Sequence, residues 1–220
     1  MVQINGTSDP SFSALADEFA RNFAERGDVG ASLSLVVDGE PVLDLWGGTL
    51  DAAGTRPWGV DSVVNVWSTT KAVNALCFAL LVDRGICAYD DPVARWWPEF
   101  GVNGKAGVTI AQLLSHQAGL CSFSEPAVVE DFYDQPRAAA RLAAQAPFWP
   151  PGSRSGYHAI SIGVLAGELF RRITGQSLGA FIIDTLAAPL SLDLTLGLPA
   201  SEEARRAEMI DPPELATPNM

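Results

Sequence analysis

In VWSTTKAVNALCFALLVDRG, residues 66–85, the end of a β-rich run passes into an apolar helical pattern. From Lys71 onward the side chains are apolar on nearly every side, which predicts a buried central helix. Gly85 is the natural end of that helix. Residues 63–67 (VVNVW) predict a short strand leading into Ser68. Ser68 is therefore expected at a junction between a strand and a buried helix.

Ser68 and Lys71 form an S-x-x-K arrangement. The i, i+3 spacing places both side chains on one helix face, and a helix N-terminus favours developing negative charge. An amine in an apolar helix loses hydration, which favours its neutral form and lets it help deprotonate a hydroxyl. Of the fourteen basic residues only Lys71 and Lys105 are lysines. We predict Ser68 as nucleophile and Lys71 as its activator; the alternative is a helix cap and a solvent-exposed amine.

Tyr157 follows the rigid turn Pro150-Pro151-Gly152 and precedes a glycine-bearing helix. A phenolate stabilised by a nearby ammonium can act as a general base, so Tyr157 is a third catalytic candidate. The alternative is an aromatic anchor of the core. Three neighbours of the two candidate loops are predicted to contact substrate. They are Trp67, Trp149 and His158.

A Ser-His-Asp triad using His116 or His158 is a competing interpretation. Ser68 does not lie in a G-x-S-x-G sequence, which such hydrolases of the α/β type place at the nucleophile. His116 ends a short helix whose start, Thr109 to Gln112, has the pattern of a capping box. For both histidines a structural or pocket-lining role is favoured over catalysis.

The segment before Ser68 predicts one helix and a β-hairpin. Apolar residues recur on one face of residues 11–26, and two β-rich runs, 31–37 and 41–46, flank Asp38-Gly39. A lone hairpin is marginal in water, so the sheet needs further strands.

The segment after residue 88 predicts mostly helices. They cover the capped helix ending near His116 and residues 135–146, 158–173 and 177–188. Gly163 and Gly167, four residues apart, permit close packing on a neighbour. We expect residues 1–88 to form the N-terminal part of an α/β domain and 89–220 a helical subdomain.

The net charge of −12 argues against nucleic acid and anionic membrane surfaces as partners. No window approaches the roughly 18 apolar residues of a membrane span, and no signal peptide is visible. The three cysteines have no metal-site spacing and fit a reducing compartment. We expect a cytoplasmic protein with a small-molecule substrate.

Five segments together resemble the serine β-lactamase-like superfamily of penicillin-recognising enzymes, and family VIII carboxylesterases most. They occur in that family's order over about residues 29–198. The segments are 30–48 (GASLSLVVDGEPVLDLWGG), 66–73 (VWSTTKAV), 90–100 (DDPVARWWPEF), 109–120 (TIAQLLSHQAGL) and 151–169 (PGSRSGYHAISIGVLAGEL).

The resemblance implies an α+β fold in which an antiparallel sheet is flanked by helices and joined to a mostly helical subdomain. It implies that Ser68 is acylated, that Lys71 activates it, and that Tyr157 shuttles the proton. The Ser68 backbone N–H would supply half of the oxyanion hole. Neither a metal nor an organic cofactor is implied. The expected reaction is hydrolysis of short-chain carboxylic esters.

Two departures from the pattern refine these expectations. The family's Tyr-x-Asn reads Tyr157-His158-Ala159 here, so the amide that helps bind β-lactams is missing, which favours an esterase. The third motif and the remaining strands should lie beyond residue 220. We therefore expect the N-terminal part of a larger enzyme, with a second polypeptide or C-terminal fragment completing the site. A β-lactamase, a D-alanyl peptidase or a non-catalytic binding subunit are the alternatives.

Overall fold

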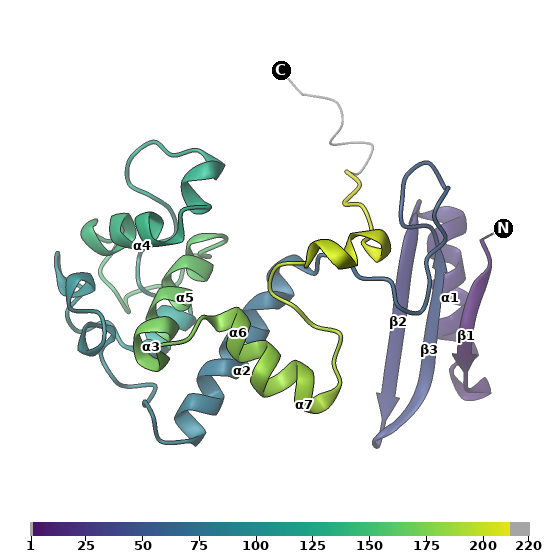
Figure 1. Cartoon of the computed structure of the whole chain (residues 1–220), viewed down its shortest axis with the longest axis horizontal. Helices are drawn as coiled ribbons and strands as arrows, with labels where there is room; N and C mark the ends of the chain where they lie inside the picture. The colour runs from purple at the N-terminus through teal and green to yellow at the C-terminus, as the bar shows by residue number, and fades with distance from the viewer. Residues whose placement is uncertain (1, 212–220) are drawn as a thin grey trace. The chain divides into compact units, whose positions relative to one another are not determined.

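The computed structural model describes residues 2–211 and divides them into two compact units (Figure 1). The first unit combines residues 2–66 with 198–211, and the second is Trp67–Gly197. This division by contacts begins the second unit at Trp67, whereas the sequence suggested a boundary after residue 88. The predicted site residues all belong to the second unit.

The first unit contains a three-stranded antiparallel sheet in the order β1-β3-β2. The strands are β1 (Ile4–Ser8), β2 (Gly30–Val37) and β3 (Glu40–Gly48). Alternate residues such as Leu43 and Leu45 face α1 (Ser13–Glu25), which lies along the sheet (Figure 1). This α+β arrangement, with a sheet that does not close, confirms the predicted fold class.

The hairpin between β2 and β3 forms where the sequence placed it. Asp38 and Gly39 both have positive φ, 51° and 85°. A two-residue turn with two positive φ angles matches the twist of the flanking strands, and aspartate followed by glycine favours it. The predicted hairpin is therefore confirmed.

Two predictions about strands were wrong. Strand β1 was missed because its residues, INGTS, are mostly polar and lack a β-rich pattern. Residues 63–67 do not form a strand: Val63 makes a single parallel bridge with Arg206, and Trp67 begins a 3-10 helix with φ 46°. A positive φ at Trp67 is incompatible with continued extended backbone.

The second unit is helical. Its α-helices are α2 (Thr70–Asp83), α3 (Ile110–Leu114), α4 (Gln135–Ala144), α5 (Ser161–Thr174), α6 (Leu178–Ile182) and α7 (Ala188–Leu190). A π-helical turn, Ile183–Ala187, joins the last two. Short 3-10 helices span Trp67–Thr69, Val93–Arg95, Pro98–Gly101 and Val129–Phe132; two more, Pro10–Phe12 and Ala200–Arg205, belong to the first unit.

Aromatic side chains join three of these helices into one core. Phe78 of α2 meets Phe170 of α5 edge to face with ring centroids 5.5 Å apart, and Phe170 meets Phe181 of α6 at 4.9 Å. Such pairs favour the T-shaped geometry electrostatically. They pack α5 and α6 against α2, and the candidate residues Ser68 and Tyr157 precede α2 and α5.

Helix α2 is buried on one face only. Cys77, Phe78 and Leu81 are buried, whereas Leu76 on the other side is 48% exposed. The prediction of burial all round was therefore wrong for the part of the chain that the structure describes. The apolar composition of α2 made its two faces indistinguishable in sequence.

Helix α3 starts as predicted and ends earlier. Thr109 accepts from the Gln112 backbone while the Gln112 side chain accepts from the Thr109 backbone, which confirms the capping box. The helix ends at Leu114, because His116 has a φ of 64° that no right-handed helix accommodates. Within residues 2–211, no helix has both the length and the apolar character needed to cross a bilayer.

Replacing Leu43 by alanine tests the core between α1 and the sheet. Leu43 is 1% exposed, so removing its side chain should lower the free energy of unfolding by about 2–5 kcal/mol. Val36→Ala is the control, because Val36 is 57% exposed and its loss should change far less. Urea unfolding measures both; equal losses would contradict this account of the core.

Candidate active site

Ser68 lies in the 3-10 turn Trp67–Thr69 immediately before α2, and its side chain is exposed. The residue before it, Trp67, has a φ of 46°. A bulky side chain rarely adopts this left-handed region, and such strain is concentrated at functional positions. The left-handed turn ends the preceding segment and starts the helix, so Ser68 is presented at the helix N-terminus.

Lys71 joins Ser68 to a distant segment. Its Nζ donates to Ser68 Oγ at 3.1 Å and to the backbone oxygen of Ala159 at 2.9 Å. The side chain is half-buried rather than enclosed, so the expected full burial of this amine is not observed. One ammonium therefore holds the serine hydroxyl and the chain just before α5.

The other lysine has the buried environment that the sequence suggested for Lys71. Lys105 is fully buried, and burial lowers the pKa of its ammonium. Its Nζ donates to the backbone oxygens of Val102 and Gln145. Both bonds go to loop carbonyls, so Lys105 stabilises a turn.

Tyr157 is brought to Ser68 from 89 residues away. Its hydroxyl donates to Ser68 Oγ at 2.6 Å, and Lys71 Nζ lies 4.9 Å from the centre of its ring. The hydrogen bond with Ser68 is the main cause that lowers the pKa of the Tyr157 phenol, followed by the interaction with Lys71. A phenol of lowered pKa beside a hydroxyl has the placement of a general base.

The loop before Tyr157 is fixed by Trp149. A Cβ added to Gly156 would lie 2.4 Å from the Trp149 ring, so the backbone passes directly over that ring. The Trp149 indole N–H donates to the backbone oxygen of Arg154 at 3.0 Å. These contacts account for the predicted rigidity of the loop.

His158 is completely buried and both of its ring nitrogens bind backbone groups. Nε2 accepts from the Leu120 N–H at 3.0 Å, and Nδ1 lies 2.6 Å from the Gly156 oxygen, to which it donates. Burial is the main cause that lowers the pKa of this imidazole. His158 thus ties two loops together through hydrogen bonds to their backbones. Its predicted contact with substrate stays a prediction.

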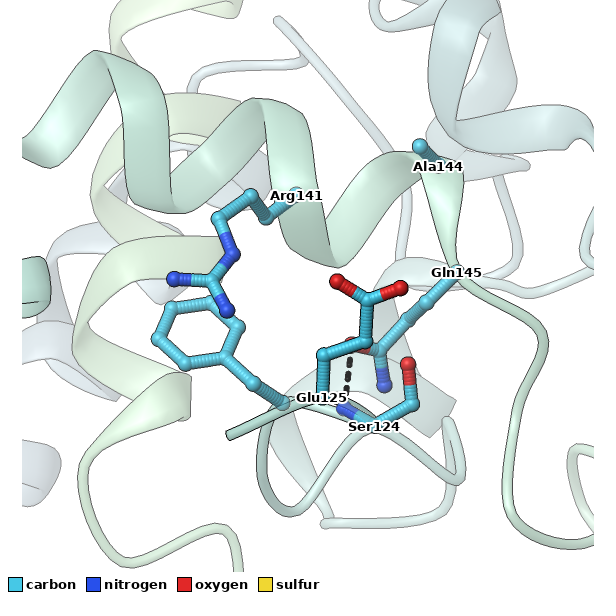
Figure 2. A pocket seen from close by; sticks show the side chains of 6 residues that line it. Ser124, Glu125, Arg141, Ala144 and Gln145 are labelled. Carbon is cyan, nitrogen blue, oxygen red and sulfur yellow. Dashed lines mark hydrogen bonds between the residues drawn. The ribbon is translucent and has the colours of Figure 1, made fainter. Parts of the chain in front are cut away.

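Two hollows in the second unit lie apart from the predicted residues. One, of about 260 Å³, contains Glu125 and Arg141, whose guanidinium lies 4.1 Å from the Phe123 ring centre (Figure 2). The other, of about 540 Å³, is lined by Asn74, Gly163 and Gly167 among others.

Sequence reasoning missed Asn74. Its side-chain oxygen is buried without a hydrogen-bond partner among the described residues. A single polar residue within the apolar run of α2 was the available signal. The expected close packing at Gly163 and Gly167 is also absent from the described part of the chain, because no atom lies within 4 Å of where either Cβ would be.

The two histidines make stability depend on pH near neutrality. Burial is the main cause that lowers the pKa of both His116 and His158 in the folded protein. The unfolded chain, with histidine pKa values of about 6.5, therefore binds more protons. This stability is complete above about pH 6.5 and is lost as pH falls towards the lowered pKa values.

Urea unfolding at pH 7.5 and 5.5 measures that loss, and the midpoint should fall with pH. The interval avoids the range near and below pH 4.5 in which paired carboxylates such as Glu168 protonate. His158→Asn should shrink the difference between the two midpoints. A midpoint that rises on acidification would contradict the assigned directions.

Known proteins are similar to this chain in sequence. The sequence profile of a family described as Beta-lactamase matches residues 19–219. Esterase/beta-lactamase LipL of Mycobacterium tuberculosis is 39% identical over 97% of this chain and 50% of its own length. Esterase EstB of Burkholderia gladioli is 33% identical over 79% of this chain and 48% of its own length.

Two solved structures are similar to this chain over nearly all of its length. A penicillin-binding protein homologue from Caulobacter crescentus is 44% identical with a TM-score of 0.92, covering 96% of this chain and 57% of its own. EstA from Arthrobacter nitroguajacolicus is 38% identical with a TM-score of 0.82, covering 93% and 53%. The chain spans about half the length of the curated relatives it matches.

Proposed function

Because this chain belongs to the Beta-lactamase family, we propose that it works as a serine hydrolase that cleaves short-chain carboxylic esters through an acyl-enzyme on Ser68. One observation carries the proposal: Ser68 Oγ accepts hydrogen bonds from both Lys71 and Tyr157. A hydroxyl with two titratable partners on an exposed helix N-terminus has a route for its proton and access to substrate.

Acylation begins when the pair formed by Lys71 and Tyr157 holds one proton fewer than an ammonium and a phenol together. Ser68 Oγ attacks the ester carbonyl carbon, and its proton fills that vacancy on the pair. The carbonyl oxygen becomes an oxyanion, which the Ser68 backbone N–H stabilises. The C–O bond to the alcohol then breaks, and the same pair returns the proton to the leaving oxygen. The acyl group remains on Ser68 as an ester.

Deacylation repeats these steps with water. Water gives a proton to the same pair and attacks the acyl carbon, and Ser68 Oγ leaves and takes the proton back. The products are a carboxylic acid and free Ser68. Lys71 and Tyr157 interact, so their shared protonation determines the pH profile, and neither is singled out as the formal base.

An ester substrate is favoured over a β-lactam by the residues after Tyr157. Ala159 stands where the resemblance places an asparagine, and here it offers only its backbone oxygen, which accepts from Lys71. Two relatives are named as esterases, which supports the same choice. The name of the first also includes beta-lactamase, so β-lactam hydrolysis is the second candidate.

Replacing Ser68 by alanine should abolish the turnover of p-nitrophenyl butyrate, with a loss on the order of 1,000-fold or more, because the nucleophile is gone. Thr69→Ala is the control, since it removes a hydroxyl from the same turn that makes no side-chain cap. Ester turnover that survives Ser68→Ala would rule out the acyl-enzyme. Nitrocefin turnover without ester turnover would favour the β-lactamase alternative.

Tyr157→Phe should lower ester turnover by about 100- to 10,000-fold, the range for loss of a general base. Tyr133→Phe is the control, because Tyr133 is 74% exposed in the same unit. Initial rates against substrate concentration separate kcat from KM, and the loss should lie in kcat. An unchanged kcat in Tyr157→Phe would remove Tyr157 from the mechanism.

The second polypeptide or C-terminal fragment suggested by the sequence stays a prediction. The intact mass of the purified sample tests it directly. The same spectra, recorded after incubation with a fluorophosphonate probe, show whether Ser68 is modified in the chain alone or only with a companion. If Ser68 is modified neither in the chain alone nor in the chain with its companion, a non-catalytic binding subunit is favoured.

A further inference from the structure

His116 contacts three consecutive residues around the catalytic candidate Tyr157. Its backbone oxygen accepts from the Gly156 N–H at 3.0 Å, and its ring Nδ1 accepts from the His158 N–H at 3.1 Å. Its ring also packs against the Tyr157 ring with centroids 5.1 Å apart. One residue following α3 therefore holds the backbone on both sides of Tyr157 and the ring between them.

The backbone of His116 is unusual. Its φ of 64° lies in the left-handed region, which is strained for a residue with a Cβ. Neighbouring bonds impose this conformation: the His116 N–H donates to Leu113 and the Gln117 N–H to Gln112, at 3.2 and 2.8 Å. Strain persists where surrounding contacts over-determine it, and such places are concentrated at functional sites.

Tyr157 needs such support. Its side chain is 57% exposed, so the core does not hold it in one rotamer. Among residues 2–211, its side chain has a hydrogen bond with the Ser68 hydroxyl, a cation–ring contact with Lys71 and a ring contact with His116. Two of these belong to the proposed reaction, and His116 is the remaining group. Loss of precise placement costs an enzyme as much as about 100-fold in rate per ångström.

The ring acts through one protonation state. Because Nδ1 accepts from a backbone N–H, the neutral ring carries its proton on Nε2. An additional proton, on Nδ1, would remove that acceptor and make the ring a second positive charge near Lys71. Burial, and then the charge of Lys71, lowers the pKa of His116. Lys71 from α2 and Tyr157 and His158 from the segment before α5 are the titratable groups that face it.

From these contacts we infer that His116, in its neutral form, is a positioning residue that holds the Tyr157 hydroxyl against Ser68. The inference rests on the proposed function and adds a residue to it. His116 is not placed as a general base, because its Nδ1 is committed to the backbone of the segment it holds.

Two substitutions separate the parts of this role. His116→Gly tolerates the left-handed backbone and removes both ring and acceptor. His116→Asn also tolerates that backbone, and its side-chain oxygen can accept from the His158 N–H without titrating near neutral pH. Ser191→Gly is the control, because Ser191 has a similar φ of 53° at the end of α7.

The rate of Ser68 acylation by p-nitrophenyl butyrate measures the effect. His116→Gly should lower kcat by about 10- to 100-fold with little change in KM. His116→Asn should restore most of that rate and make it less sensitive to acid than in the wild type, because its acceptor does not titrate. Ser191→Gly should leave the rate unchanged. A rate in His116→Gly equal to that of the wild type would overturn the inference while leaving the Ser68 mechanism intact.

A double-mutant cycle distinguishes positioning of Tyr157 from general support of the fold. In a Tyr157→Phe background, His116→Gly should cost much less than in the wild type, because the hydroxyl that it places is already gone. An equal loss in both backgrounds would show that His116 acts elsewhere and would overturn the inference.

Long-range proton–nitrogen NMR spectra test the same inference without any activity. His116 should show the tautomer protonated on Nε2, and amide exchange at His158 should be faster in His116→Gly than in His116→Asn. A proton on Nδ1 at neutral pH would overturn the inference. If the wild type never acylates, the proposed function fails, whereas these spectra still decide whether His116 holds the Tyr157 segment.

Discussion

The hydrogen bonds of the Lys71 ammonium hold the candidate site together. Its two hydrogen bonds, to Ser68 Oγ and to the Ala159 backbone oxygen, join the start of α2 to the chain leading into α5. Since a charged donor makes a stronger bond than a neutral one, this link resists separation of the two segments. It also brings Tyr157, two residues before Ala159, within 2.6 Å of the serine oxygen.

The helical core makes that link possible. Phe78 lies two turns beyond Lys71 on α2 and packs on Phe170 of α5, so the two helices are held together in one core. At the other side of the site, His116 and the buried His158 bind the backbone around Tyr157. The exposed candidate groups thus rest on less exposed side chains that are hydrogen-bonded to the backbone, which is how a rigid scaffold supports a site.

The hydrogen bonds of both histidine rings argue against a catalytic role for either histidine. In sequence, a serine and two histidines permit a triad, and the arguments against it were the sequence around Ser68 and the capped helix that precedes His116. In the structure, Nδ1 of His116 and both nitrogens of His158 bind the backbone. These nitrogens are therefore occupied by the backbone around Tyr157, and the family comparison, in which two relatives are named as esterases, supports a hydrolase.

Features that arise within a few residues could be predicted from the sequence. The Asp38-Gly39 turn, the Thr109–Gln112 capping box and the serine–lysine spacing follow from local backbone preferences and helix geometry. Three features emerge only from long-range packing: the polar strand β1, the one-sided burial of α2, and the contact of Ser68 with a tyrosine 89 residues away. These depend on which surfaces pack together, and no local pattern carries that information.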